Sequence, residues 1–459
     1  MSHFEIEGFP QELDVASVGF GPAGIALACA LEDETEDSGK RPYQRVRFFE
    51  KGQDSTWHGS FLLAGTDINH HVFRDLVTPR NPRSRFSFAM YLKEKGRLYK
   101  FGLLGRPASR VEWSDYIAWV AAQLKDYVSY DEGVLDVLPV TEKGTLRAVD
   151  LITAQGTYRT RRLILSHGSL PRIPDVFAGH LGGRVFHTSQ YLKNVHLGGG
   201  PIAQRWLVLG SGQSAGEAVA HLLGAAPTTQ VHSVHRGVGF RVGQLGQFPN
   251  MAFLPEQVDY FHQLEPARRT KVFEAIRSTN YAGIDADESQ ALYSFLYEGE
   301  VSGHQRLNLH TWSSVVSVEK VGGAYSVLLR DSNTGVQRTL YVDGIVLGTG
   351  YEQLPIPPLL TLLQPWLQRD EDGALAVDRH YRVGLHNSEG LHIFANGTSE
   401  KAHGISDAQS FSMVALRAEQ LTDALLASQP RPLAHSLAQN KVRTLPPKSN
   451  TSARVEARP

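Results

Sequence analysis

The chain has 459 residues, of which 41% are hydrophobic and 20% charged, and its formal net charge is −1. This length exceeds a single hydrophobic core and predicts two or three domains, while the balanced charge excludes a strong pull toward nucleic acid or an anionic membrane. No apolar stretch reaches about 18 residues and residues 1–12 are acidic, so we expect a cytoplasmic protein without a membrane span or signal peptide.

The first predicted elements surround a glycine-rich turn. Residues 14–18 have the apolar pattern of a short buried strand, and residues 23–31 have that of a helix of small and apolar residues. Between them stand Gly19, Gly21 and Gly24 in the motif G-x-G-x-x-G. Such glycines allow a sharp turn and let a pyrophosphate approach the backbone at the positive end of a helix. A tight turn without a ligand is the alternative interpretation.

The next predicted strand, residues 46–49, ends at Glu50. An acidic residue at this position accepts hydrogen bonds from a ribose hydroxyl, so we expect FAD at the first turn. The spacing exceeds the usual ~20 residues because the polar segment 33–44 intervenes. The helix of this turn also contains Cys29, the only cysteine, which excludes an intrachain disulfide and the C-x-x-C pair of disulfide reductases.

A second glycine turn lies about 190 residues further on, with Gly210, Gly212, Gln213 and Ser214 in the sequence G-S-G-Q-S-A. The strand that follows, residues 230–234, leads to Arg236. A basic side chain there suits the 2′-phosphate of NADPH, so we expect NADPH at the second turn. A solvated arginine without a ligand is the alternative.

The fold class predicted from this order is α/β, with two Rossmann-like dinucleotide-binding domains and a small helical substrate region. The predicted FAD domain comprises residues 1–198 and 351–427, with strands at 162–166 and 390–395 and a last helix at 406–427. The predicted NADPH domain comprises residues 199–245 and 305–350, and a glycine–proline linker at 197–201 precedes it. Residues 246–304 form the helical region, and residues 428–459 are expected to be a disordered tail.

Three other interpretations deserve comparison. Ser214 lies in a G-x-S-x-G pattern with Asp343 and His403 downstream, as in a serine hydrolase, but that reading leaves the first turn and residues 349–351 unexplained. His232 and His235 would point to opposite faces of a strand, so we expect no metal site. A flavin-binding sensor without turnover would not need a separate NADPH turn.

Motifs along residues 14–420 resemble those of the microbial N-hydroxylating flavin monooxygenases that act on L-ornithine or L-lysine in siderophore assembly. Besides both turns, these motifs are W-H-G at 57–59, D-L-V-T-P-R-N-P at 75–82, F-S-F at 86–88, F-H-T-S-Q-Y at 186–191, T-N-Y at 279–281, the segment 343–351 and H-G-I-S-D at 403–407. The resemblance implies that NADPH reduces FAD, that O₂ adds at the flavin C4a carbon, and that the resulting hydroperoxide hydroxylates a neutral amine.

The resemblance also assigns site residues. Arg74 takes the place of the family's lysine that contacts the substrate carboxylate, and Asn250 that of an asparagine on the same carboxylate. Asn280 corresponds to the asparagine that meets the substrate amine, and Ser412, with Ser410 as the competing choice, to a serine of the pocket. Asn280 and Ser412, together with Asn69, are therefore the expected catalytic residues, and the further cofactor contacts are expected from Asn69, Trp57, His58, Thr349, Gly350 and Tyr351.

Several positions near the expected flavin site depart from the family pattern. Ile68 and Asn69 replace a Met–Gln pair, His70 and His71 follow them, and Ser60 with Phe61 replaces the usual methionine after W-H-x-G. Either the pocket is reshaped or these are neutral packing exchanges. We expect L-ornithine as substrate, L-lysine as the second candidate, and a diamine or the guanidine of arginine as the third. O₂ is the co-substrate, and we expect a homo-oligomer that binds no nucleic acid.

Overall fold

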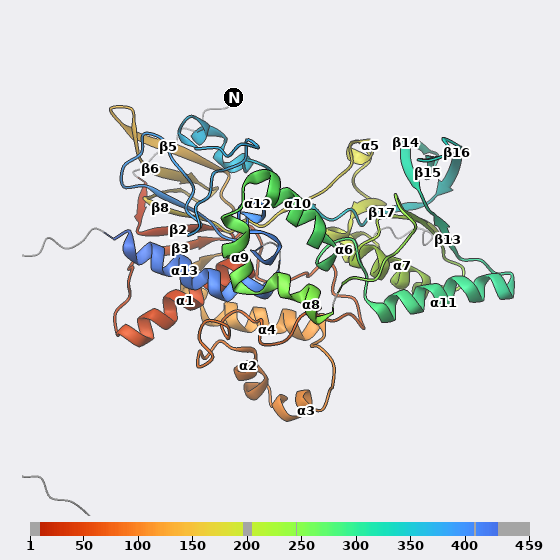
Figure 1. Cartoon of the computed structure of the whole chain (residues 1–459), viewed down its shortest axis with the longest axis horizontal. Coiled ribbons are helices and arrows are strands. Elements are labelled where there is room, and N and C mark those ends of the chain that lie inside the picture. The colour runs from red at the N-terminus through yellow and green to blue at the C-terminus, as the bar shows by residue number, and fades with distance from the viewer. Residues whose placement is uncertain (1–9, 196–203, 245, 408–409, 430–459) are drawn as a thin grey trace, which may run out of the picture.

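A computed structural model describes residues 10–195, 204–244, 246–407 and 410–429 and shows two α/β units side by side (Figure 1). The first unit is built on a five-stranded parallel sheet in the order β19-β8-β2-β3-β4. Its strands are β2 (Val15–Val18), β3 (Val46–Phe49), β4 (Val128–Ser129), β8 (Arg162–Leu165) and β19 (His392–Ala395). The predicted α/β class with Rossmann-like sheets is thereby confirmed.

Both faces of this sheet are covered, which is why its strands read as short continuous apolar runs. On one face lie the helices α1 (Pro22–Ser38), α4 (Arg110–Gln123) and α13 (Val414–Ala427), whose apolar side chains pack around Val15 and Phe48. The small helices α2 (Phe88–Glu94) and α3 (Leu98–Gly102) lie outside α4 (Figure 1). The opposite face carries Ala16 and Val18 against a four-stranded sheet in the order β1-β7-β6-β5.

The second unit repeats this plan with a parallel sheet in the order β10-β17-β11-β12-β13. Its strands are β10 (Val185–His187), β11 (Arg205–Leu209), β12 (Gln230–Val234), β13 (Leu307–His310) and β17 (Gly344–Leu347). Helices α7 (Gln213–Ala225) and α11 (Ala286–Ser302) pack on one face through Ala218 and Leu292. On the other face lies an antiparallel sheet of β14 (Ser313–Val321), β15 (Ala324–Asp331) and β16 (Gln337–Val342), together with α5 (Asp175–Ala178).

The two units also share most of their chain order, except that the strand at one edge comes last in the first unit (β19) and first in the second (β10). In the first, β1 (Gln11–Leu13) precedes β2, and the strands β5 (Asp136–Glu142), β6 (Thr145–Ile152) and β7 (Thr157–Thr160) stand between β4 and β8. In the second, β14, β15 and β16 stand at the equivalent place between β13 and β17. Each glycine turn leaves the middle strand of its five-stranded sheet. Both turns therefore lie at the carboxyl edge of a parallel sheet, where such folds bind ligands.

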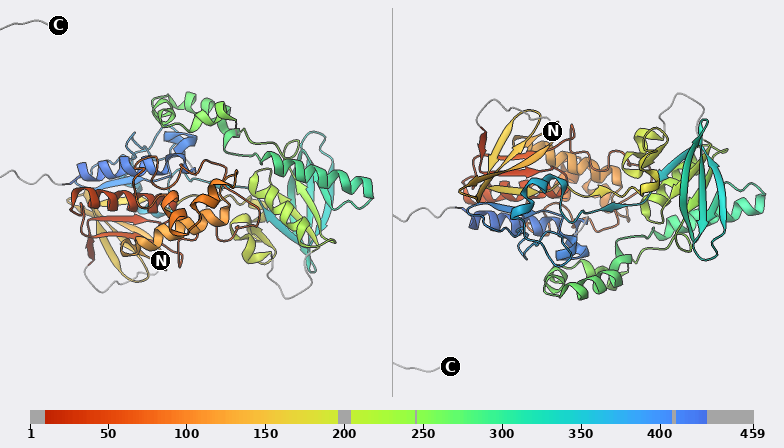
Figure 2. Two further views of the ribbon diagram at one scale, coloured as in Figure 1. Left: turned by 90° about the horizontal axis from the view of Figure 1, so that it is seen from below. Right: turned by 90° about the horizontal axis from the view of Figure 1, so that it is seen from above.

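A layer of short helices connects the units, as Figure 2 shows from above and below. It contains α8 (Gln247–Asn250), α9 (Pro255–His262), α10 (Pro266–Ile276) and α12 (Glu400–His403), whereas α6 (Tyr191–Asn194) lies beside β10 of the second unit. Helix α9 docks on the first unit because the ring of Phe261 packs against Gly404 and Asp259 pairs with Arg379. Residues 246–304, which were predicted to be helical, contain α8, α9, α10 and α11.

Some boundaries differ from those predicted. Helix α1 runs to Ser38, so the first half of the polar segment 33–44 is helical. Strand β10 pairs with β17 in the second sheet, ahead of the predicted boundary at residue 198, because a strand of three residues leaves no readable pattern. Helix α11 belongs to the second unit, since Leu292 is buried against α7. Helix α13 begins at Val414, eight residues later than predicted, because 3-10 turns precede it.

Two predicted segments cannot be compared with the structure. The linker at 197–201 and the tail beyond residue 429 both lie outside the described residues. Within the described part, no helix is long and apolar enough to cross a bilayer.

Candidate functional site

The first glycine turn has room for a side chain at only one of its three glycines. Gly19 has φ +97°, and a Cβ there would lie 2.4 Å from the carbonyl oxygen of Ser166. A Cβ on Gly24 would lie 2.6 Å from the carbonyl oxygen of Gly19. Gly21 has nothing within 4 Å of that position, and it caps α1 without a side-chain hydrogen bond. Packing requires Gly19 and Gly24, whereas Gly21 leaves open space at a helix N-terminus that fits a pyrophosphate.

Glu50 lies beside this turn at the end of β3. Its carboxylate accepts hydrogen bonds from the backbone N–H groups of Phe20 and Gly52, both at 2.9 Å. These bonds orient the carboxylate toward the turn, and each oxygen keeps a lone pair that can accept from a ribose hydroxyl. The position predicted for Glu50 therefore suits a nucleotide, and the contact itself stays a prediction.

The second glycine turn repeats the geometry of the first. Gly210 has φ +143°, and a Cβ there would lie 2.2 Å from the carbonyl oxygen of Gly348. Gly212 caps α7 without a side-chain hydrogen bond, and the atom nearest to its hypothetical Cβ is 3.9 Å away in Ala282. A glycine fixed by packing is again followed by an open helix cap.

The side chains predicted to hold the second dinucleotide differ in how they are engaged. Gln213 donates to Glu217 at 3.0 Å and to Asp285 at 3.3 Å, and its carbonyl oxygen accepts from the Asp285 N–H at 3.0 Å. A cofactor contact by the Gln213 amide would compete with these bonds. Ser214 is half-buried on the first turn of α7, and Arg236 is exposed after β12. Arg236 forms no ion pair within the described residues.

Residues 349–351 cross between the two units. Thr349 donates its hydroxyl hydrogen to the carbonyl of Arg172. Nε2 of His187 donates to the carbonyl of Gly350 at 3.0 Å, and the ring of Tyr351 meets that of His187 edge-on at 5.1 Å. Strand β18 (Tyr351–Glu352) then pairs with β9 (Leu170–Pro171). The predicted segment thus lies at the seam between the two units.

Arg74 and Ser412 meet although 338 positions separate them in the chain. Nη1 of Arg74 donates to the Ser412 hydroxyl at 3.2 Å, and the guanidinium lies 5.8 Å from the ring centre of Phe253. Burial lowers the pKa of Arg74, but a guanidinium remains charged. No Asp or Glu of the described residues forms an ion pair with it. The structure therefore holds a half-buried cation without an anionic partner.

Ser410, the competing candidate, has a supporting position. Its hydroxyl donates to that of Ser412 at 2.9 Å and accepts from the Ser412 N–H at 3.1 Å. The geometry favours Ser412 as the serine beside Arg74.

The two predicted substrate asparagines lie in different segments near this point. Asn250 ends α8, immediately before the 3-10 turn Met251–Phe253 that carries the aromatic neighbour of Arg74. Asn280 is exposed, and the next residue, Tyr281, donates its hydroxyl hydrogen to Glu400. Burial raises the pKa of Glu400. Asn250 thus lies three residues before the aromatic neighbour of Arg74 in the chain, and Asn280 directly before the tyrosine that bonds to α12.

Aromatic rings line the approach to Ser412. The ring of Phe411 meets Trp57 edge-on at 5.5 Å and stacks on His70 at 5.1 Å. His58 lies against Trp57 at 4.2 Å, and Asn69 is exposed just before His70. Burial lowers the pKa of His70 to about 4, so its ring is neutral near pH 7. One of the departures from the family pattern, His70, therefore belongs to the wall of this region.

Sequence reasoning missed a buried polar group beneath α1. Asn396 donates to the carbonyl of Ala23 and to the hydroxyl of Ser166, both at 3.0 Å. Arg417 donates to Asn396 at 2.8 Å and pairs with Asp407. Asn396 and Ser166 directly follow β19 and β8, so their positions after parallel strands were the available signal.

The serine hydrolase alternative is not assembled. Asp343 pairs with Arg205 at 2.8 Å, and His403 bonds to the carbonyl of Asp378 at 3.1 Å and stacks on Tyr381. Neither contacts Ser214 on α7.

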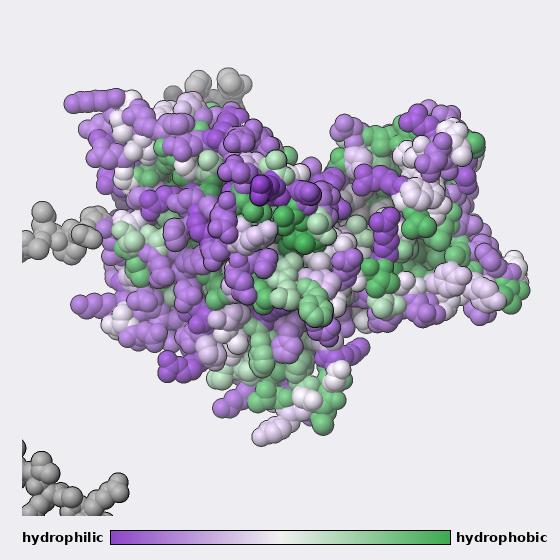
Figure 3. Space-filling view, viewed as in Figure 1, coloured by the Kyte–Doolittle hydropathy of each residue, from purple (hydrophilic) through white to green (hydrophobic). Residues whose placement is uncertain are grey.

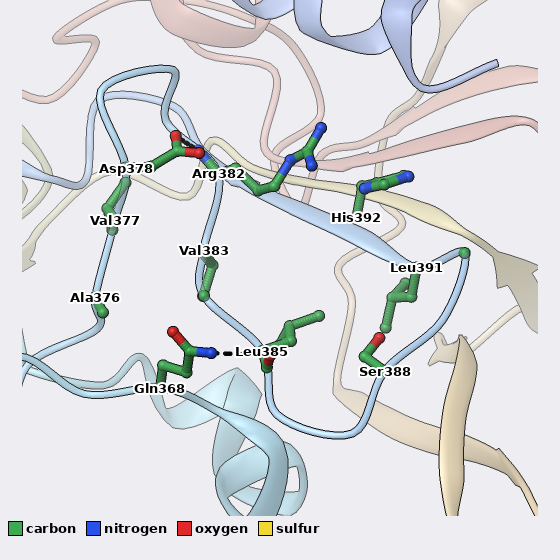
Figure 4. A pocket seen from close by; sticks show the side chains of 12 residues that line it. Gln368, Ala376, Val377, Asp378, Arg382, Val383, Leu385, Ser388, Leu391 and His392 are labelled. Atoms are coloured by element: carbon green, nitrogen blue, oxygen red, sulfur yellow. Dashed lines mark hydrogen bonds between the residues drawn. The ribbon is translucent and has the colours of Figure 1, made fainter.

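A cavity of about 540 Å³ lies elsewhere, between residues 368 and 392 (Figure 4). Two of its polar side chains bond within the protein: Gln368 donates to the carbonyl of Leu385 at 3.0 Å, and Asp378 accepts from the Arg382 N–H at 2.9 Å. The buried hydroxyl of Ser388 has no hydrogen-bond partner within the described residues. The cavity contains none of the predicted site residues.

Comparison with known proteins agrees with this geometry. Residues 11–353 match the family model described as L-lysine 6-monooxygenase/L-ornithine 5-monooxygenase. The L-ornithine N(5)-monooxygenase of Pseudomonas aeruginosa is 33% identical over 90% of this chain and 93% of its own length. The structure of the L-lysine 6-monooxygenase from Pseudomonas syringae is 52% identical, with a TM-score of 0.83, over 91% of this chain and 99% of that chain.

The chain belongs to the L-lysine 6-monooxygenase/L-ornithine 5-monooxygenase family. This membership confirms the resemblance found in the sequence and the expected class of enzyme. A structure of the ornithine N-hydroxylase of Kutzneria sp. 744 is named with reduced FAD, NADP⁺ and L-ornithine. It has a TM-score of 0.83 and 31% identity over 91% of this chain and 99% of that one. Those ligands agree with the two cofactors predicted here.

Proposed function

We propose that this protein N-hydroxylates the terminal amine of L-ornithine, with L-lysine as the second candidate, using FAD, NADPH and O₂. FAD and NADPH supply the oxygen activation and the reducing equivalents when they are bound. The open cap at Gly21 would receive the pyrophosphate of FAD, and Glu50 its ribose. The open cap at Gly212 would receive the pyrophosphate of NADPH, and Arg236 the 2′-phosphate. The product suits siderophore or related biosynthesis.

The observation that carries the substrate class is the unpaired guanidinium of Arg74. A half-buried cation without an acidic neighbour is costly, and a bound carboxylate would satisfy it with two parallel hydrogen bonds. Ser412 already accepts from Arg74 at 3.2 Å, which holds the fork in place. Asn250, on the helix before Phe253, can donate its amide to the same carboxylate. An α-amino acid therefore suits this site better than a diamine.

The other end of the substrate must be an uncharged amine. An alkyl amine has a pKa near 10.4 in water, and transfer to an apolar surrounding favours its neutral form. The rings of Trp57 and Phe411 would exclude water there. Asn69 and Asn280 would orient the nitrogen through hydrogen bonds without acting as bases, because amides do not take up a proton near pH 7. Ser412, which was also expected at the nitrogen, accepts from Arg74 and would therefore serve the carboxylate end.

A substrate panel tests this proposal. We expect L-ornithine or L-lysine to give hydroxylamine in proportion to the NADPH oxidised, while putrescine, cadaverine and arginine give less. Both quantities must be measured, because NADPH oxidation alone also reports peroxide leakage. A purified protein that binds no flavin, or a diamine turned over better than both amino acids, would contradict the proposal.

We also propose a homo-oligomer located in the cytoplasm, where NADPH is available. Large apolar side chains gather on the α2–α3 segment, at the lower edge of Figure 3; the exposed ones are Leu98, Tyr99, Leu103 and Leu104. A second group forms a stripe on α11 and comprises Tyr293, Tyr297 and Val301. The first surface adds the bases Lys93 and Lys100, and the second the acids Glu298 and Glu300. Two copies related by a two-fold axis could place each α11 on the partner's α2–α3 segment.

Light scattering on Leu103→Glu and Tyr297→Glu tests this contact. Each variant should yield monomers. A monomeric unmodified protein at micromolar concentration would refute the proposed oligomer.

A further inference from the structure

Arg110 and Glu217 form a buried ion pair that joins the two α/β units. Arg110 is the first residue of α4, whose side chains fill the core of the first unit, and Glu217 lies on α7 in the second unit. Nη1 and Nη2 of Arg110 each lie 2.7 Å from a different carboxylate oxygen, and the side chains are only 9% and 3% exposed. Because a guanidinium fork engages both oxygens in one plane, the pair fixes orientation as well as distance.

The contact continues to the helix end where the second dinucleotide is expected. Glu217 also accepts from Gln213 at 3.0 Å, and Gln213 is the first residue of α7, directly after the open cap at Gly212. The amide of Gln213 in turn engages both the backbone N–H and the carboxylate of Asp285, which caps α11. One chain of bonds therefore runs from the first unit, which is expected to hold the flavin and is called the flavin unit below, through the amino end of α7 to α11.

Arg110 is surrounded by acidic groups. Besides Glu217, the carboxyls that face this cluster are those of Asp67, Asp285, Asp287 and Glu288, and Arg106 is the other base near Asp67. Burial and like charges raise the pKa of Glu288 to about 8 and that of Asp285 to about 6. Loss of Arg110 would leave uncompensated negative charge beside the helix end that must accept an anionic pyrophosphate.

Stability alone does not account for this pair. Removing two charges from water costs about as much as their attraction returns, and a well-packed apolar pair of similar size is often as stable or more so. An apolar contact can slide, however, whereas a bidentate pair has one geometry. Hydride transfer depends steeply on distance, and a misplacement of about 1 Å can cost roughly 10²-fold in rate.

We propose that Arg110 and Glu217 are positioning residues for the reduction of FAD by NADPH, holding the amino end of α7 at a fixed place relative to the flavin unit. The inference rests on the proposed assignment of FAD to the first turn and NADPH to the second. In this step the hydride of bound NADPH, one hydrogen nucleus with two electrons, would pass to the oxidised flavin and leave NADP⁺. Neither residue needs to touch either cofactor.

The test compares the paired variant Arg110→Met/Glu217→Met with a matched control, Arg80→Met/Asp33→Met. The control pair is buried to the same degree, with side chains 9% and 4% exposed, but it lies entirely within the first unit. Both double variants should keep a melting temperature near that of the unmodified protein, since no charge is left unpaired. Flavin reduction by NADPH should slow by about 10-fold or more only in the Arg110/Glu217 variant. Chemical reduction by dithionite should be unchanged in both.

A second measurement needs no cofactor. Hydrogen exchange of the hydrogen-bonded α7 amides, from Ala215 onward, should be faster in flavin-free Arg110→Met/Glu217→Met and unchanged in the control. Arg110→Lys, which keeps the charge but loses the fork, should fall between the unmodified protein and the double variant in both readouts, and it serves as the test if the double variant does not fold.

The outcomes separate the inference from the proposed function. If the unmodified protein is not reduced by NADPH, the proposed function fails. If it is reduced, and the Arg110/Glu217 variant is reduced at the same rate or exchanges α7 amides at the same rate, the pair is only structural and this inference is overturned.

Discussion

Replacing Arg74 by alanine should raise the KM for the amino acid substrate far more than the KM for NADPH. The variant removes a half-buried guanidinium that pairs with no acidic residue of the described chain. A hydrogen bond to a charged group contributes about 1.5–3 kcal/mol, and each 1.4 kcal/mol is about tenfold in affinity. Part of this binding free energy is offset because Arg74 also donates a hydrogen bond to Ser412. We therefore expect KM for L-ornithine or L-lysine to rise about 10- to 50-fold.

Putrescine provides the internal control for this variant, because it has the amine of ornithine but no carboxylate. Its KM should change little in Arg74→Ala, so the preference of the enzyme for ornithine over putrescine should shrink by the same factor. Arg74→Lys keeps a charge but not a bidentate fork, so its preference for ornithine over putrescine should lie between that of the unmodified protein and that of Arg74→Ala. Steady-state kinetics should follow hydroxylamine formation, since NADPH oxidation can be uncoupled.

Two results would refute the reasoning about Arg74. One is an equal rise in KM for putrescine and for ornithine, which would indicate a distorted pocket. The other is an equal rise in KM for NADPH, which would indicate that Arg74 serves the cofactor sites.

Three further predictions concern the cofactor turns and the acidic cluster. Arg236→Ala should weaken NADPH binding by about 1–3 kcal/mol and leave NADH nearly unchanged, and an unaltered ratio of the two dissociation constants would exclude a 2′-phosphate contact. Gly21→Ala should melt near the unmodified temperature but lose bound flavin, because the new methyl group meets no protein atom. Gly19→Ala should fail to fold stably, because its methyl group would collide with the backbone of Ser166. Retained yellow colour in folded Gly21→Ala would count against the pyrophosphate site. Glu288→Gln should raise the free energy of unfolding by about 1–2 kcal/mol at pH 8 and by less at pH 5, as checked by urea titration. The pKa of Glu288 is raised in the folded state, so the ionisable side chain costs stability as pH rises from about 4.5 toward 8.

The cofactor turns could be predicted from the sequence because their signals are local. A buried strand, glycines at fixed spacing and a helix stand within about 20 residues of one another, and the residue after the next strand distinguishes the nucleotides. The short strand β10 and the helix α11, which packs in the second unit, carried no local signal of this kind. Strand β10 has three residues, and α11 was assigned by its neighbours in sequence although Leu292 packs against α7.

The substrate residues could be named from the resemblance, but their partners could not. Arg74 meets Ser412 across 338 positions, and no spacing rule relates such residues. The same applies to Arg110 and Glu217, 107 positions apart, which no motif distinguished from surface charges. Gln213 was predicted as a cofactor contact from its place in the glycine turn, yet its amide is engaged by Glu217 and Asp285. A turn motif identifies where the backbone lies, whereas the use of each side chain depends on what packs against it.

The two units resemble each other in structure, but their sequences resemble each other only at the glycine turns. Four of the five parallel strands follow the same order in both units, and antiparallel strands stand at the same place in the chain, yet only the glycine turns look alike. In the core, many combinations of apolar side chains fill the same volume, so the pattern survives wide exchange. At Gly19 and Gly210 a Cβ would lie within 2.4 Å of a carbonyl oxygen, and no other residue fits. The turns remain recognisable because the backbone itself demands glycine there, and the ligand then uses the opening that the glycines leave.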